Sequence, residues 1–106
     1  FDEVKSKGLA IAGKAGDPVM AAADGRVVYA GSGLRGYGNL VIVKHNATYL
    51  TAYAHNQTLL VKEDQAVRRG QRIAEMGSTD AERVQLHFEI RKLGKPIDPA
   101  KLLPPR

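Results

Sequence analysis

Two short segments of the chain carry a histidine in surroundings that suit metal binding or proton transfer. His55 follows Tyr53-Ala54, and His87 lies within the run Gln85-Leu86-His87-Phe88-Glu89-Ile90. A neutral imidazole is a common metal ligand, and the same ring acts as a general acid or base near neutral pH. A catalytic zinc takes about three protein ligands from His, Cys, Asp and Glu and keeps one position open for water. These segments are therefore the first candidates for a functional site.

The chain offers few further groups for such a zinc site. It contains three histidines and no cysteine, and the third histidine, His45, ends an apolar run just before a turn-like segment, Asn46-Ala47-Thr48. We therefore predict that His45 is a surface or turn residue. A zinc site would have to combine the distant His55 and His87 with a carboxylate such as Glu89. Glu89 lies two residues from His87, where its carboxylate competes with the imidazole for space. Catalytic zinc is thus disfavoured, and no cofactor is expected.

Alternation along residues 84–91 predicts a strand with two different faces. Side chains of a strand point to opposite faces in turn. The face that we predict to be core carries Val84, Leu86, Phe88 and Ile90, and the other carries Gln85, His87, Glu89 and Arg91. The polar row is either an ordinary solvated face or the floor of a groove, and we favour the groove. Tyr53 and His55 are also two residues apart, so they are expected to line the same floor.

The elements that position these residues are predicted to be strands. The predicted strands cover residues 8–12, 19–22, 26–30, 40–45, 49–55, 71–76 and 84–91. Asp24-Gly25 predicts a hairpin, and 46–48 joins the clearest hairpin of the chain. Tyr37 lies in a glycine-dense loop at 31–39, and only residues 100–103 suggest a helical turn. The expected fold is one all-β domain, mostly antiparallel, over residues 1–106.

Composition limits the classes of partner. The 106 residues are 43% hydrophobic and carry a formal net charge of +5, which favours an acidic partner or polymer. No nucleic-acid motif is present, and no apolar run is long enough to span a membrane. The absence of cysteine gives no information on redox compartment. Because the chain opens at Phe1 without an initiator methionine, we expect it to be the C-terminal fragment of a longer parent.

Several blocks of the sequence resemble the LytM (lysostaphin-like) zinc endopeptidase family. That family carries His-x-x-x-Asp, then Tyr-x-His, then His-x-His-Phe-Glu, and the second and third motifs correspond to 53–55 and 85–89 here. Further matching blocks lie at 17–19, 24–27, 36–39, 67–74 and 77–79, so the resemblance covers about residues 5–100. It implies a single antiparallel β-sheet or sandwich of the LytM (duplicated hybrid motif-like) type, with little or no helix.

The same resemblance implies that the catalytic site has been lost. Ser6 stands at the position of the first histidine, Ala10 at that of the aspartate, and Gln85 at that of the first histidine in the last motif. The implied metal positions are therefore Ser6, Ala10 and His87, and the implied acid–base positions are His55 and Gln85. A serine hydroxyl is a poor zinc ligand and alanine is none. The chain is expected not to be an enzyme.

Within the family the chain is similar to degenerate, NlpD-like activators of cell-wall hydrolases. The resemblance implies a non-catalytic activator of a periplasmic N-acetylmuramyl-L-alanine amidase that promotes septal peptidoglycan splitting, from a parent that is an outer-membrane lipoprotein. The alternatives are a peptidoglycan-binding module that uses the relic groove, and a residual zinc-dependent endopeptidase. The groove expected to bind the amidase's regulatory segment contains Lys7, Ala10, Tyr37, Leu40, Tyr53, His55, Gln85, His87, Glu89 and Arg91.

Overall fold

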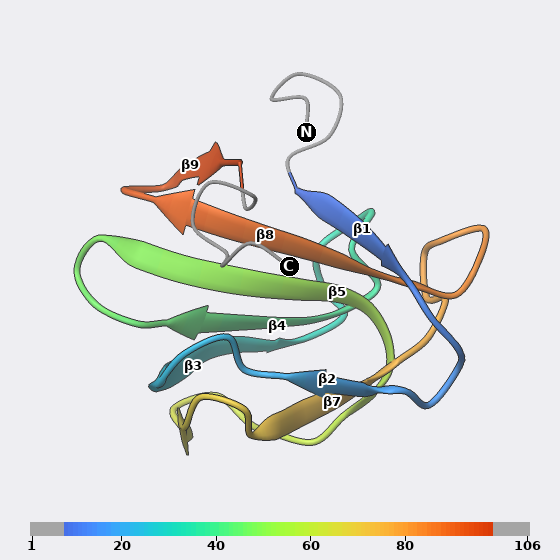
Figure 1. Ribbon diagram of the computed structural model, residues 1–106, viewed down its shortest axis with the longest axis horizontal. Helices are drawn as coiled ribbons and strands as arrows, with labels where there is room; N and C mark the ends of the chain where they lie inside the picture. The colour runs from blue at the N-terminus through green and yellow to red at the C-terminus, as the bar shows by residue number, and fades with distance from the viewer. Residues whose placement is uncertain (1–7, 99–106) are drawn as a thin grey trace.

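The computed structural model describes residues 8–98 of the chain, which form nine strands. These are β1 (Leu9–Ala12), β2 (Pro18–Met20), β3 (Gly25–Gly31), β4 (Asn39–Lys44), β5 (Tyr49–Leu59), β6 (Ala66–Val67), β7 (Arg72–Met76), β8 (Gln85–Lys92) and β9 (Lys95–Ile97) (Figure 1). No helix occurs within this described part, and every strand pair is antiparallel. The all-β prediction is confirmed. The helical turn predicted at 100–103 lies outside the described residues.

The long strand β5 organises the sheet, whose main order is β1-β8-β5-β4-β3-β6. Its first part pairs with β4 and β8, and its last part leaves β8 to pair with β7. Figure 1 shows β5 curving at this end towards β7, which in turn carries β2. The sheet therefore folds over on itself, with β9 lying beside β8 as a short added edge.

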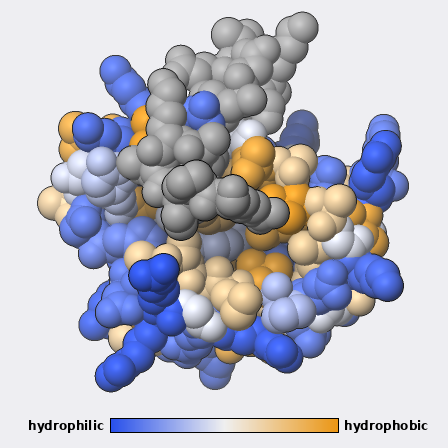
Figure 2. Space-filling view, in the orientation of Figure 1, coloured by the Kyte–Doolittle hydropathy of each residue, from blue (hydrophilic) through white to orange (hydrophobic). Residues whose placement is uncertain are grey.

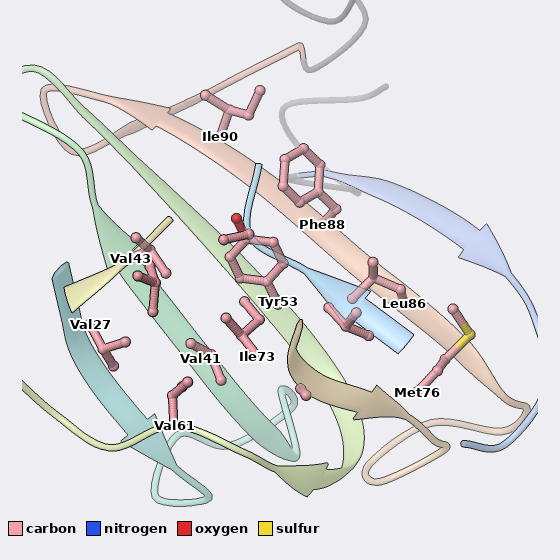
Figure 3. Close-up of a cluster of buried hydrophobic side chains, with 14 residues drawn as sticks. Val27, Val41, Val43, Tyr53, Val61, Ile73, Met76, Leu86, Phe88 and Ile90 are labelled. Atoms are coloured by element: carbon pink, nitrogen blue, oxygen red, sulfur yellow. The ribbon is translucent and has the colours of Figure 1, made fainter. Parts of the chain in front are cut away.

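The main hydrophobic core lies between β2 and β7 on one side and the central strands on the other. Figure 3 shows aliphatic and aromatic side chains from β3, β4, β5, β7 and β8 meeting in this space. Leu86, Phe88 and Ile90 are all buried there, and Val84 packs against the same cluster. The apolar face predicted for residues 84–90 is confirmed. Burial of such side chains contributes roughly 1.5–3 kcal/mol each, so this cluster dominates the stability of the fold.

The opposite face of the central strands carries a second, smaller apolar cluster. Leu40, Ala52 and Ala54 are buried in it, and Tyr29, Tyr37 and Ile42 pack against it while remaining partly exposed. Strands β4 and β5 are thus apolar on both faces, which explains the unbroken burial from Thr51 to Asn56.

The two hairpin predictions have different outcomes. The β4–β5 turn is confirmed, and the Asn46 side-chain oxygen accepts hydrogen bonds from the backbone N–H groups of Thr48 and Tyr49. The hairpin predicted at Asp24-Gly25 is wrong, because β2 pairs with β7 whereas β3 pairs with β4 and β6. Gly25 is needed for another reason: a Cβ there would lie 2.6 Å from the Lys44 carbonyl oxygen.

One face of the molecule has a largely hydrophilic outline. Figure 2 shows hydrophilic side chains along most of the outline of one face, with hydrophobic side chains exposed nearer its middle. Within residues 8–98 there is no helix that is long and apolar enough to cross a membrane.

Candidate functional site

A buried carboxylate lies at the centre of the polar face of β8. Glu89 is only 1% exposed, yet both of its oxygens are bound. Its Oε2 accepts a hydrogen bond from His87 Nε2 at 2.7 Å, and its Oε1 lies 2.9 Å from Arg91 Nε and 2.8 Å from Arg91 Nη2. The side chains that were expected to compete for space instead form one bonded row. This His87–Glu89–Arg91 row is called the ionic network below.

The ionic network keeps its carboxylate charged. Burial alone raises the pKa of the Glu89 carboxyl, but the hydrogen bonds from His87 and Arg91, together with the Arg91 charge, outweigh burial and hold the pKa below its usual range. Tyr37 lies over this row, and its hydroxyl oxygen is 3.4 Å from Arg91 Nη2. Burial and then the nearby Glu89 carboxylate raise the pKa of Tyr37, so its phenol stays protonated at neutral pH.

His55 reaches this face through an unusual backbone conformation. Its φ of 68° lies in the left-handed region, where the register of β5 also shifts from β8 to β7. The His55 Nδ1–H donates to the Thr79 carbonyl oxygen at 2.7 Å, and the ring centre lies 6.1 Å from that of His87. The Tyr37 ring is also 6.1 Å from the His87 ring. The structure therefore brings His55, His87 and Tyr37 together.

Tyr53 is not part of this cluster, and the prediction that it lines the groove floor is wrong. It is opposite Phe88 in the sheet register, and its ring packs against the Phe88 ring at 5.4 Å in the main core. Ala54 is the residue opposite His87. The left-handed residue His55 breaks the alternation of β5, so residues 53 and 55 do not share a face as a regular strand would require.

The replaced positions lie beside His87 where the structure describes them. Ala10 on β1 is opposite His87, and Gln85 at the start of β8 is opposite Ala12. Opposed residues of an antiparallel pair share one face, so Ala10 places only a methyl group next to the imidazole. Ser6 and Lys7 lie outside the described residues. We call the group Ala10, His55, Gln85, His87 and Glu89 the relic site.

One wall of the relic site is formed where the loop before β4 is hydrogen-bonded to the loop between β7 and β8. Thr79 Oγ1 accepts a hydrogen bond from the Asn39 backbone N–H at 3.0 Å and donates to the Asn56 carbonyl oxygen at 2.8 Å. Asp80 Oδ2 accepts from the Gly36 N–H at 3.2 Å. Gly38 has a φ of 63° and leaves no room for a Cβ against Thr79. Thr79 was not among the predicted site residues, although it lies in the block at 77–79 that resembles the LytM family.

The described part of the relic site does not fit a catalytic zinc. Within residues 8–98, no group of three or more His, Cys, Asp or Glu side chains is placed to hold a metal ion. Ala10, the residue opposite His87, has no donor atom. Loss of ligands removes affinity that depends on ligand number and geometry.

An apolar cavity of about 360 Å³ continues from the ionic network across β4 and β5. We call this cavity the trough; it is lined by Leu34, Tyr37, Leu40, Ile42, Leu50, Ala52, Glu89, Arg91 and Gly94. Four of the predicted groove residues thus line it, namely Tyr37, Leu40, Glu89 and Arg91. The trough and the relic site share Glu89 and form two parts of one surface.

Comparison with known proteins gives consistent matches over nearly the whole chain. The sequence pattern of peptidase family M23 matches residues 4–99. The chain is 65% identical over 101 residues to the lipoprotein NlpD/LppB homologue of Pseudomonas aeruginosa, covering 95% of this chain and 34% of that protein. It is 59% identical over 101 residues to the murein hydrolase activator NlpD of Escherichia coli, covering 95% of this chain and 27% of that protein. The chain spans about a third or less of these relatives.

A solved structure supports the same fold. The catalytic domain of the antimicrobial peptidase lysostaphin from Staphylococcus simulans superimposes with a TM-score of 0.85 at 27% identity, covering 91% of this chain and 77% of that one. The expected LytM-type fold is therefore confirmed.

Proposed function

This chain belongs to peptidase family M23, and from that premise we propose that its domain is a non-catalytic activator of a cell-wall hydrolase. The observation that carries the proposal is the residue opposite His87. Position 10 holds alanine, which has no donor atom for a metal. Two relatives that are 59% identical to this chain over 101 residues are murein hydrolase activators, which supports the same role.

The relic site has features that suit binding. Hydrogen bonds fix the His55 ring to Thr79, the His87 ring to Glu89, and the Asn39 backbone to the Thr79 side chain. A binding surface whose side chains are already held loses less conformational entropy when a partner arrives. Tyr37 and Arg91 are residue types that often dominate interface energies, and both belong to this surface.

We propose further that the hydrolase is a periplasmic N-acetylmuramyl-L-alanine amidase acting in septal peptidoglycan splitting. The relic site and the trough would receive the amidase's regulatory segment. Resemblance to NlpD-like activators supports this choice, and the +5 charge speeds encounter with an acidic partner. The lipoprotein relatives support placement in the cell envelope, and the periplasm is proposed on the same basis.

The test combines a purified amidase of this class with dye-labelled peptidoglycan. We expect the domain to increase dye release by the amidase and to release none alone, with added zinc or with chelator. Tyr37→Ala should weaken activation roughly tenfold, as for an interface residue worth about 1–3 kcal/mol. Arg72→Ala, an exposed change on β7, is the matched control and should activate normally.

Three outcomes would contradict the proposal. Dye release by the domain alone that a chelator abolishes would point to a residual endopeptidase. Binding of the domain to purified cell-wall sacculi without any effect on the amidase would point to a peptidoglycan-binding module. Normal activation by a folded Tyr37→Ala variant would place the working surface elsewhere.

A further inference from the structure

The trough has an apolar floor that the described residues, 8–98, leave open. Leu40, Ile42, Leu50 and Ala52 line it from β4 and β5, on the face opposite the main core. Ile42 and Leu50 remain partly exposed. Leaving apolar area in water costs about 25 cal/mol per Å². Contiguous exposed apolar surface on a monomer often marks an interaction site.

An exposed leucine extends this apolar surface at the edge of the trough. Leu34 lines the trough from the loop before β4 and is 44% exposed. It does not contribute to the core clusters formed by the described residues. An exposed leucine beside an apolar floor suits a partner with bulky apolar side chains.

A cationic row leads from the trough across the sheet. Arg26 is opposite Lys44 in the register, Lys44 is opposite Leu50, and Leu50 is opposite Arg91. Opposed residues share a face, so Arg26 and Lys44 project from the same face as the trough. Both are exposed, and Arg35 adds a third exposed cation beside Leu34.

The carboxylate that lines the trough does not offset these cations. Glu89 is buried and already paired with Arg91 and His87. Arg91 also points one guanidinium nitrogen at the Gly94 carbonyl oxygen and another at the Tyr37 hydroxyl, each at 3.4 Å. Arg91 therefore holds the trough together. Among residues 8–98, the exposed cations on or beside this face include Lys44, Arg35 and Arg26, and Arg26 also donates to the Asp64 carbonyl oxygen at 2.6 Å.

From this arrangement we propose that the trough binds a peptide segment in which one or two bulky apolar side chains are flanked by carboxylates. The apolar side chains enter between Leu34 and Ile42, and the carboxylates meet Lys44 and Arg26. The inference rests on the proposed function, since it defines the chemistry of the segment that the activator receives. In this proposal the trough selects the peptide, and Arg91 keeps the residues that line the trough in position.

The test selects peptides from a library of random dodecapeptides displayed on phage, using the immobilised 106-residue chain. We expect enrichment of peptides in which Leu, Ile or Phe is flanked by Asp or Glu. An enriched peptide, synthesised with a fluorescent label, should bind more weakly as salt rises, because exposed charge pairs are screened.

Matched variants locate the binding site. Leu34→Glu should weaken peptide binding roughly tenfold or more, as for loss of a strong interface residue. Leu60→Glu makes the same change at a leucine of similar exposure, 45%, on the chain after β5, and should leave binding unchanged. Lys44→Glu should weaken binding and remove most of its salt dependence, whereas Lys62→Glu should do neither.

Enrichment of basic peptides, absence of any consensus, or equal binding by the Leu34→Glu chain would overturn the proposal. The amidase assay separates this outcome from the proposed function. Normal amidase activation by Leu34→Glu and Lys44→Glu would leave the proposed activator function standing and contradict the proposed role of the trough. An acidic–apolar consensus combined with no activation of any amidase would support the proposed peptide binding and contradict the activator function.

Discussion

Two buried polar networks lie on opposite faces of the same strands, and they differ in charge. On the groove face, the ionic network joins His87, Glu89 and Arg91. On the core face, a neutral chain of hydrogen bonds runs from Ala22 through Tyr53 and Thr51 to His45. We call this chain the neutral network. His45, which was predicted to be a surface or turn residue, directly follows β4 and is only partly exposed.

Donors and acceptors in the neutral network can be assigned from its two ends. The Asp24 carbonyl oxygen can only accept, so His45 Nδ1 carries the proton and donates at 2.7 Å. His45 Nε2 then accepts from the Thr51 hydroxyl at 2.8 Å, and Thr51 Oγ1 accepts from the Tyr53 hydroxyl at 2.7 Å. The Tyr53 oxygen accepts from the Ala22 N–H at 2.9 Å. With this assignment the side chains of His45, Thr51 and Tyr53 are all hydrogen-bonded, and no charged group is needed.

The comparison shows what each network does for the molecule. The neutral network fastens the segment at residues 22–24 to the central strands, so it supports the fold. The ionic network joins Tyr37 and the β8–β9 turn through Arg91, on the face that carries the relic site and the trough. Burying a charge carries a desolvation cost that neutral groups largely avoid.

Breaking the ionic network at its cation should give the largest loss of stability. Arg91→Met leaves Glu89 buried with only His87 as partner. Removing one member of a buried pair costs about 3–5 kcal/mol, and because Arg91 is partly exposed we expect roughly 2–4 kcal/mol. Urea unfolding followed by fluorescence or circular dichroism measures the difference. A loss below about 1 kcal/mol, the scale of a surface pair, would mean that water already screens Glu89.

Breaking the neutral network should cost less. Tyr53→Phe removes the hydroxyl between Thr51 and the Ala22 N–H. That N–H loses its partner, whereas Thr51 keeps its hydrogen bond to His45. We expect a loss of about 1–3 kcal/mol. Tyr29→Phe is the control, since its hydroxyl accepts from the exposed Gly33 N–H at 2.8 Å and should cost about 1 kcal/mol or less. Equal losses for the two variants would show that the neutral network adds nothing beyond an ordinary hydrogen bond.

The smallest effect is expected from pH. The folded pKa of Glu89 is depressed, so its contribution to stability is present above the unfolded pKa of about 4.3 and is lost as pH falls through the folded pKa. The stability difference between the parent and Glu89→Gln should therefore shrink as pH falls below about 4.3. A constant Glu89→Gln difference would contradict the ionic assignment.

The core side of β8 could be predicted from the sequence because it depends on local geometry. A strand of period two places Leu86, Phe88 and Ile90 together whatever its neighbours are. The polar face of the same strand followed from the same rule, and the structure places His87, Glu89 and Arg91 in one bonded row. Strand and hairpin signals predicted the all-β fold, and the family blocks, which span nearly the whole chain, implied the same fold.

The face that Tyr53 occupies could not be predicted, because it depends on one backbone angle. The Tyr-x-His spacing suggests two side chains on one face, but the φ of 68° at His55 turns its ring towards His87 while Tyr53 enters the core. The pairing of β2 with β7 could not be predicted from neighbouring residues either. The two strands are some fifty residues apart in the chain, as the pairing of Val19 with Ala74 shows. Short strands β6 and β9 carry too few residues for a period to emerge.

By itself the sequence determined the residue types at the replaced positions and the apolar face of β8, because both are properties of neighbours along the chain. Only the tertiary structure decided that Glu89 is enclosed between His87 and Arg91, that Thr79 holds His55, and that an apolar trough crosses β4 and β5. These features need segments that are distant in sequence to meet. Burial, pairing and the orientation of an imidazole are set by those meetings and not by spacing.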